Sequence, residues 1–297
     1  MMKLSLKQLS KPCVVIACLL ASFEFMPLTV CAQMFNGPVS RATGNTGRAA
    51  IEFSEGPLLN PAVITQTQGA GLAVHRGSSL WAAAPHDEFA LVVVDRSPGV
   101  LLPASFTAVL RQEAEGSTLQ DYQFILAHQP MGRVSVGVAV HHLRYEKPTQ
   151  EIDFSSNNMH LGLLYTPYAN LGFALVAYNV FPEAEAPTHA QVMEALPGVG
   201  IGAQYYMSEM IRFRMDMAKN FSASEGNALD AMFGFETYVL VNLAVRMGYA
   251  WQNTRGKELF TTGLGWKGPR LSVDLALQKD IHAAGGWSQL IDLHLPL

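Results

Sequence analysis

The sequence predicts an all-β protein: a transmembrane antiparallel β-barrel of about 14 strands with an N-terminal plug segment. Apolar and polar residues alternate in segments of about ten residues, aromatic residues lie near the segment ends, and the connections alternate between tight and long. A tilted strand needs about 9–11 residues to cross a bilayer, whereas soluble strands usually stop near five or six. These features favour a membrane barrel over a soluble β-sandwich, which alternation alone would also fit.

Composition excludes several other classes. The 297 residues are 49% hydrophobic and 15% charged, and the mean hydropathy is +0.16. Globular proteins average about 25% charged residues, so this chain is too apolar for intrinsic disorder and for a comfortably soluble surface. A formal net charge of −4 provides no basic surface of the kind that binds nucleic acid. No run beyond the leader reaches about 18 consecutive apolar residues, which excludes a helical membrane protein.

Residues 1–32 are predicted to be a secretory signal peptide. Lys3, Lys7 and Lys11 precede an apolar run over 13–23, which is too short to span a bilayer, and small residues precede a plausible cut before Gln33. The alternative is lipid attachment at Cys31, but the bulky Val30 stands where a lipoprotein signal has a small residue. All three cysteines lie in this leader, so the mature chain has no cysteine nucleophile or thiolate metal site, apart from Cys31 if it carries lipid.

Residues 33–66 do not alternate, and their Gly-Pro and Asn-Pro pairs predict loops and turns with one helical turn around 48–54. A barrel of this size leaves space that its own side chains cannot fill. We therefore expect 33–66 to form a plug or periplasmic segment and 67–297 to form an outer-membrane β-barrel.

The strand assignment is clearest at Ile211-Arg212-Phe213-Arg214-Met215-Asp216-Met217, where a strand sorts the charges onto one face and a helix would scatter them. The segment 104–112 is a weaker strand, and the turn near Tyr238-Val239-Leu240 lacks turn-forming residues. The predicted strands are 67–76, 87–95, 104–112, 119–129, 132–145, 157–166, 171–180, 198–207, 210–219, 230–238, 240–251, 258–267, 270–279 and 287–297.

The connections indicate the orientation. Those around 130–132, 167–170, 208–209 and 267–269 are tight, while 146–156, 181–197, 220–229 and 280–286 are long and polar. Short periplasmic turns and longer external loops are typical of outer-membrane barrels.

Charged residues of both signs fall on the faces that this assignment turns toward the lumen. They could form a polar or ion-selective pathway, but a pairing network that allows buried charges to survive is the favoured interpretation. The predicted lumen network comprises Arg133, Arg212, Arg214, Asp216, Glu236, Arg246, Asp274 and Asp292.

Metal and catalytic sites are not predicted, and no cofactor is expected. Among His128, His141, His142 and His160, alternation sends His141 and His142 to opposite faces, and no acidic residue stands at metal-binding spacing beside them. Ser135 shares a face with His141 but lies about 20 Å away at strand rise, too far for proton transfer. No Gly-x-Ser-x-Gly pattern occurs, and the glycine-rich stretch 44–47 lacks the lysine of a phosphate loop.

Two short motifs carry a family resemblance. Gly44-Asn45-Thr46-Gly47-Arg48-Ala49 followed by Asn60-Pro61-Ala62, and Gly234-Phe235-Glu236 with Arg246-Met247-Gly248-Tyr249, resemble the long-chain fatty-acid transporter (FadL-type) superfamily of outer-membrane barrels, which includes secretion-accessory barrels. The resemblance implies 14 strands, a plug inside the lumen that contains Gly44, Gly47, Arg48, Asn60 and Pro61, and, for the transporters, sideways passage of hydrophobic molecules through the wall.

Two functions are compatible with this architecture. The preferred one is a plugged channel or transporter for small hydrophobic molecules, which predicts a gap or kink in the wall and an apolar pocket near the plug. The alternative is a non-transporting structural or secretion-accessory barrel that presents external loops such as 181–197 to a partner, with a lumen sealed by side chains. Either would reside in the Gram-negative outer membrane, in contact with lipid and lipopolysaccharide, after insertion by the barrel assembly machinery.

Overall fold

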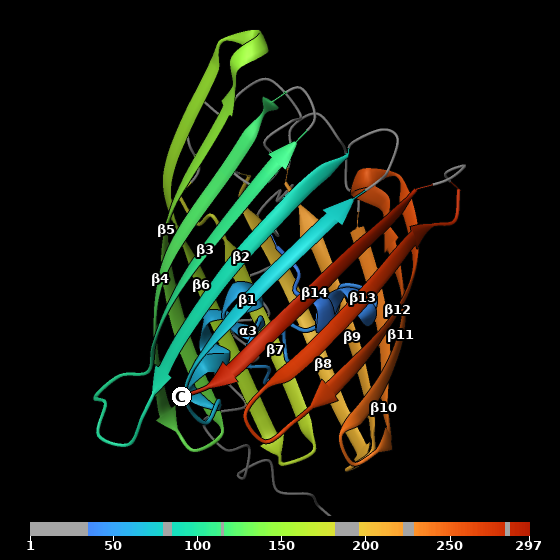
Figure 1. Ribbon diagram of the computed structural model, residues 1–297. Helices are drawn as coiled ribbons and strands as arrows, with labels where there is room; N and C mark the ends of the chain where they lie inside the picture. The colour runs from blue at the N-terminus through green and yellow to red at the C-terminus, as the bar shows by residue number, and fades with distance from the viewer. Residues whose placement is uncertain (1–34, 80–84, 114–115, 182–195, 222–228, 283–285) are drawn as a thin grey trace, which may run out of the picture.

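The computed structural model describes residues 35–79, 85–113, 116–181, 196–221, 229–282 and 286–297. These residues form a closed antiparallel barrel in which each strand pairs with its neighbours in sequence and the last strand pairs with the first (Figure 1). The predicted fold class is confirmed. The predicted signal peptide lies outside the described residues.

The described strands number 14. Their bounds are β1 (Gly69–Ser79), β2 (His86–Arg96), β3 (Ala104–Glu113), β4 (Thr118–Met131), β5 (Val134–Lys147), β6 (Ile152–Tyr168), β7 (Leu171–Tyr178), β8 (Gly198–Ser208), β9 (Ile211–Asn220), β10 (Leu229–Leu240), β11 (Leu243–Gln252), β12 (Lys257–Lys267), β13 (Ser272–Asp280) and β14 (Trp287–Pro296). Short helices are α2 (Pro38–Ala42), α3 (Gly56–Leu59) and the 3-10 turns η3 (Pro61–Thr65), η5 (Pro148–Gln150) and η7 (Asn253–Arg255). No helix among the described residues is long and apolar enough to cross a membrane.

One connection differs from the prediction. The segment 146–156 was expected to be a long polar loop, but β5 and β6 continue through most of it and join through η5, so the hairpin projects beyond its neighbours (Figure 1). Cross-strand pairs such as Tyr145 with Phe154 extend the ladder there. The polar residues that suggested a loop occupy strand positions outside the apolar belt.

Strand alternation separates an apolar exterior from a polar interior. On β9, Phe213 is 44% exposed, whereas the neighbouring Arg214 is 3% exposed and faces inward. The same division repeats around the barrel, leaving Phe, Leu, Val and Met side chains on the outside. A soluble barrel would turn these side chains inward, so the exterior fits a hydrocarbon solvent.

The wall is continuous across the middle of the barrel. Among the described pairings, register shifts occur at four places: His128/Met131, Tyr165/Tyr168, Tyr206/Ser208 and Tyr238/Leu240. All four adjoin the short turns at one end, including the turn at Val241–Asn242 where the sequence shows little turn chemistry. The gap or kink expected of a lateral opening is therefore absent at mid-height from the described strands.

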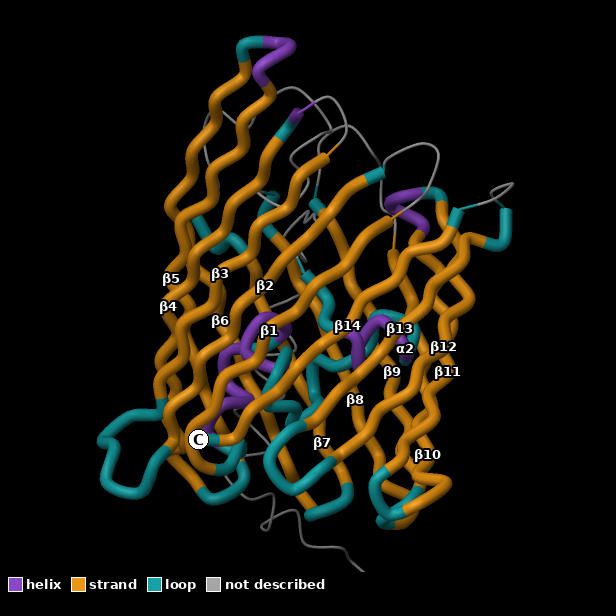
Figure 2. The backbone as a smooth tube through the Cα atoms, in the orientation of Figure 1, coloured by secondary structure: helices purple, strands orange, loops and turns teal. Residues whose placement is uncertain are grey.

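Residues 35–67, which we call the lumenal segment, lie inside the barrel (Figure 2). Helix α2 contacts β11–β14 on one side, and η3 contacts β2 and β4–β6 on the other. Most side chains of the segment are fully buried. The segment therefore spans the interior from wall to wall.

Two of the wall glycines lie directly against the backbone of this segment. A Cβ atom on Gly137 of β5 would overlap the backbone of Pro61 and Ala62, and one on Gly248 of β11 would overlap the backbone of Thr43 and Gly44. Backbone cannot move aside as a flexible side chain can, so these positions require glycine.

We predict that Gly137→Val and Gly248→Val each displace the lumenal segment and lower the free energy of unfolding by about 1–3 kcal/mol, the usual cost of overpacking. Urea unfolding of the barrel in detergent micelles measures this loss. Gly132→Val is the control, because a Cβ atom there meets nothing within 4 Å. Unchanged stability in both interior variants would contradict the described packing.

Candidate functional site

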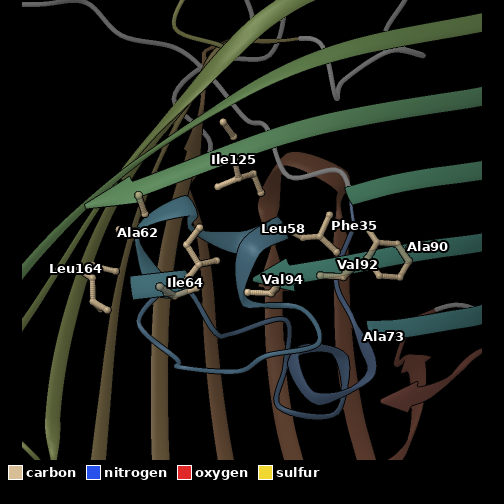
Figure 3. Close-up of a cluster of buried hydrophobic side chains, with 14 of the residues drawn as sticks. Phe35, Leu58, Ala62, Ile64, Ala73, Ala90, Val92, Val94, Ile125 and Leu164 are labelled. Atoms are coloured by element: carbon tan, nitrogen blue, oxygen red, sulfur yellow. The ribbon is translucent and has the colours of Figure 1, made fainter. Parts of the chain in front are cut away.

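The lumenal segment meets an apolar wall on one side. Leu58 and Ile64 pack against inward side chains of β2–β6, together with Phe35 near β1 and β2 (Figure 3). The wall residues of this cluster are Ala73, Ala90, Val92, Val94, Val109, Ile125, Ala127, Ala139, Leu164, Ala174 and Leu290. An interior wall that faced only water would be polar, so this apolar side is a specific feature of the lumen.

A second apolar cluster lies on the same strands nearer the projecting hairpin. It consists of Leu119, Leu143 and Tyr145, with Phe154 packed beside them. Between the two clusters, Asp121 and His141 form a buried polar layer on β4 and β5. The inner face of these strands is thus apolar at two levels and polar between them.

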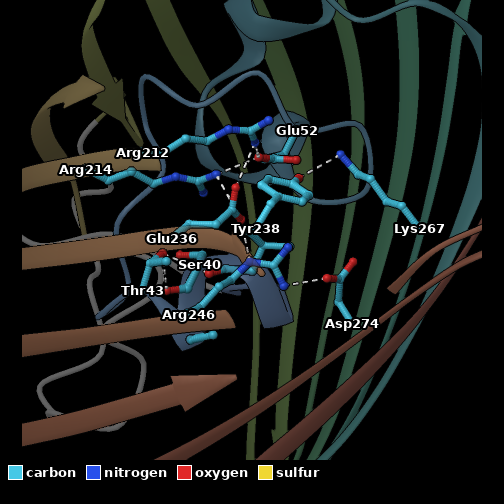
Figure 4. A network of polar contacts seen from close by, with 12 residues as sticks. Ser40, Thr43, Glu52, Arg212, Arg214, Glu236, Tyr238, Arg246, Lys267 and Asp274 are labelled. Atoms are coloured by element: carbon cyan, nitrogen blue, oxygen red, sulfur yellow. Dashed lines mark hydrogen bonds and ion pairs between the residues drawn. The ribbon is translucent and has the colours of Figure 1, made fainter. Parts of the chain in front are cut away.

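The opposite wall carries charges (Figure 4). Glu52 of the lumenal segment lies 2.6 Å from Arg214 and 3.5 Å from Arg212. Arg212 also pairs with Glu236 at 2.9 Å, and Arg246 lies 2.5 Å from both Glu236 and Asp274. Strand pairing creates this network, because Glu236 is the cross-strand partner of both Arg212 and Arg246.

Two further ion pairs hold the lumenal segment to the wall. Arg41 pairs with Glu88 of β2, and Arg48 lies 3.0 Å from Asp216 of β9. Asp216 also accepts hydrogen bonds from the backbone N–H groups of Gly47 and Arg48, at 2.9 and 3.0 Å. With Glu52, the segment is bound by charge on both sides of the barrel.

The remaining motif residues shape the segment. Asn60 donates to the backbone oxygen of Arg48 at 2.9 Å and accepts from the Ala62 N–H at 3.0 Å, while Pro61 begins η3. Gly44 and Gly47 have φ angles of +73° and +143°, which glycine adopts without strain.

The two glutamates of the segment differ in charge state. Burial raises the pKa of Glu52, but Arg214 and neighbouring cations outweigh it and lower that pKa to about 2. Burial, reinforced by Glu52, raises the pKa of Glu55 well above its ordinary value. Neither oxygen of Glu55 has a hydrogen-bond partner among the described residues. Glu52 is therefore ionised at neutral pH, whereas burial favours the protonated form of Glu55.

Most of the predicted lumen residues come together, but two do not. Arg212, Arg214, Glu236, Arg246 and Asp274 form the network, and Asp216 binds Arg48. Arg133 is exposed in the turn between β4 and β5 and lines a cleft at that end of the barrel, outside the network. Asp292 faces inward beside His75, 3.8 Å away, outside the network.

Sequence reasoning missed Glu52, Arg41 and Glu88. Glu52 and Arg41 lie in a segment without periodicity, which offers no signal for which way a side chain points. Glu88 is inward on β2 by simple alternation and could have been found that way.

The histidines separate as alternation predicts, with His141 buried and His142 exposed on opposite faces; His128 is also exposed, and His160 is buried. His141 lies 2.9 Å from Asp121 and 2.8 Å from Asn179, and its ring is 4.2 Å from that of His160. Asp121 is on the neighbouring strand, a relation that spacing along one strand does not reveal. Within the described residues, no group of three or more His, Cys, Asp or Glu side chains could hold a metal ion.

A cleft of about 430 Å³ opens at the end of the barrel with the short turns. It lies between Ile51 and Gln66 of the lumenal segment and Tyr168, Gln204 and Tyr206 of the wall. Its lining mixes aromatic and amide groups and adjoins the register shift at Tyr165/Tyr168. The cleft gives the lumenal segment a face toward the solvent at that end.

Comparison with known proteins identifies the fold. No protein-family model and no curated protein matches the sequence. The CymD monoaromatic hydrocarbon channel matches with a TM-score of 0.63 at 14% identity, covering 87% of this chain and 96% of that one. The Pseudomonas putida toluene transporter TodX matches with a TM-score of 0.59 at 12% identity, covering 91% of this chain and 100% of that one. A Pseudomonas aeruginosa FadL homologue matches with a TM-score of 0.63 at 10% identity, covering 91% of this chain and 99% of that one.

The chain therefore has the fold of the FadL-type outer-membrane barrels, which confirms the 14-stranded barrel that the sequence resemblance implied. The matching structures are outer-membrane barrels, and the apolar exterior of this chain fits a barrel that is embedded in lipid. These structural neighbours are transporters or channels and not enzymes.

We predict that Glu52→Gln lowers the free energy of unfolding by about 2–4 kcal/mol. Removing one partner of a fully buried ion pair costs about 3–5 kcal/mol, and the Glu52 side chain retains 14% exposure, which reduces the loss. Urea unfolding measures the change. Glu55→Gln is the matched control and should alter stability by less than about 1 kcal/mol, because Glu55 is already neutral. Equal losses in the two variants would contradict the assigned charge states.

The raised pKa of Glu55 also predicts a pH dependence. Its protonated form favours the folded state, so this stability is complete below the ordinary glutamate pKa of 4.5 and is lost as pH rises through the raised value. Unfolding midpoints measured from pH 5 to pH 10 should therefore fall more steeply in the parent protein than in Glu55→Gln. Parallel profiles would show that Glu55 does not carry the proton.

Proposed function

We propose that the barrel conducts small hydrophobic molecules across the outer membrane and that the lumenal segment is its plug. The observation that carries this proposal is the apolar inner face of β2–β6, against which Leu58 and Ile64 pack. The neighbours described as a monoaromatic hydrocarbon channel and a toluene transporter support the same substrate class. No catalysis is assigned to the chain.

The arrangement gives a route without a preformed hole. An apolar solute would find favourable contacts at the Leu119–Leu143–Tyr145 cluster and again at the cluster around Ile125 and Leu164, whereas an ion would lose its hydration at either cluster without a polar partner. Since interior side chains are almost fully buried, passage requires the plug to shift along its apolar side. The Arg48–Asp216 and Glu52–Arg214 ion pairs with β9, on the other side, hold the plug in the barrel during such a shift.

The alternative, a structural or secretion-accessory barrel, is favoured by the filled interior and by the continuous wall at mid-height. The two functions differ in what crosses the membrane. A conduit passes small apolar molecules, and a structural barrel passes nothing.

We predict that host cells without hydrocarbon-transporting barrels of their own, when they express this protein, accumulate labelled toluene several-fold faster than cells with the empty vector. The uptake of a sugar of similar size should not increase. Ala139→Trp fills the apolar side between β5 and the plug and should abolish the gain. Ala218→Trp is the control, because Ala218 lies on the inner face of the opposite wall. Absence of any toluene gain in the parent protein would establish the structural alternative.

A further inference from the structure

The outer wall carries an elongated apolar hollow of about 630 Å³ on β7–β12. Two adjacent rows of cross-strand partners line it. One row is Ala203, Met215, Phe233, Tyr249 and Phe260, and the other is Leu171, Tyr205, Phe213, Phe235 and Met247. At about 4.8 Å between strands, each row of five residues extends over roughly 20 Å, so the hollow is shaped for a chain and not for a compact ligand.

The first row ends on a cation. Phe260 of β12 is the cross-strand partner of Lys279, and Lys279 is the partner of Trp287 on β14. Lys279 is exposed, and its ammonium lies 5.3 Å from the centroid of the Trp287 ring. It precedes the last residue of β13 at the end of the barrel that bears the projecting β5–β6 hairpin.

Polar groups mark the membrane boundary at this end of the hollow. The Tyr249 hydroxyl donates to Glu258 at 2.5 Å, and His282 lies 3.2 Å from the same carboxyl group. The Glu258 carboxylate is thus engaged by two neighbours, which limits its repulsion of an anion at Lys279. The remaining lining of the hollow, from Phe260 to Leu171, is mainly apolar.

An apolar groove with positive charge at one end complements an amphipathic lipid that has an acidic head and a hydrocarbon chain. Lys279 lies at the end of the barrel with the long connections, and this end faces the cell exterior. The lipid that reaches Lys279 therefore belongs to the outer leaflet. We propose that this groove binds lipopolysaccharide, with one acyl chain along the two rows and a phosphate at Lys279.

Native mass spectrometry of the barrel purified from outer membranes tests this proposal. We expect one lipid A-containing adduct to survive delipidation, and we expect Lys279→Gln and Ala203→Trp each to reduce its occupancy at least tenfold. The first variant removes the charge, and the second fills the groove while keeping the charge. Arg76→Gln is the control, because Arg76 is an exposed cation on β1 that already lies 3.2 Å from Asp87.

Circular dichroism, and the shift in electrophoretic mobility between unheated and heated samples, confirm that each variant is a folded barrel. Equal adduct occupancy in all variants would overturn the assigned site. A phospholipid adduct in place of lipid A would overturn the choice of lipid, and a lipid-free dimer lost in Ala203→Trp would show that a second copy covers the groove. These outcomes are independent of the toluene measurement, since the groove is on the outside of the wall.

Discussion

The need to satisfy every backbone hydrogen bond inside hydrocarbon determines the rest of this structure. A sheet can meet it only by closing on itself, and closure gives each strand one face toward lipid and one toward the lumen. Phe213 beside Arg214 shows the result at a single peptide bond, with an apolar ring outside and a guanidinium inside. The low overall content of charge follows, because about half of each strand must be apolar.

Closure creates a second problem, since the walls of a barrel this wide cannot fill their own interior. The lumenal segment fills it with two kinds of contact. On β2–β6 it packs through Leu58 and Ile64, whereas on β9–β13 it is held by Glu52 and its arginine partners. Buried ion pairs add little net stability compared with apolar packing, but they fix geometry, because any shifted position leaves a charge unpaired. The interior is therefore mainly apolar on β3–β6 and mainly ionic on β9–β13, and Arg41 with Glu88 of β2 adds one ion pair beside the apolar side.

The barrel could be predicted from sequence because its signal is strictly local. Alternation identified every described strand, including the weak one at 104–112 and the turn near Leu240, since lipid on the outside imposes the pattern at each position. It failed at 146–156, where strands continue beyond the membrane and the apolar pattern ends before the hydrogen bonds do. It placed Arg133 in the lumen because a turn residue has no assigned face. The partners of Glu52 and Arg41 depend on the path of a nonperiodic segment, which no local pattern encodes.

The most direct test of this account is the accessibility of neighbouring residues on one strand to lipid-soluble and water-soluble reagents. Spin labels at Met215→Cys and Ala218→Cys of β9 are suitable, because all three natural cysteines lie within the first 31 residues. Electron paramagnetic resonance in bilayers should show strong relaxation by oxygen at residue 215, which faces lipid, and weak relaxation by any collider at residue 218, which is enclosed. Strong oxygen relaxation at 218 with protection at 215 would contradict the outward placement of the apolar faces and the functional proposals that depend on it.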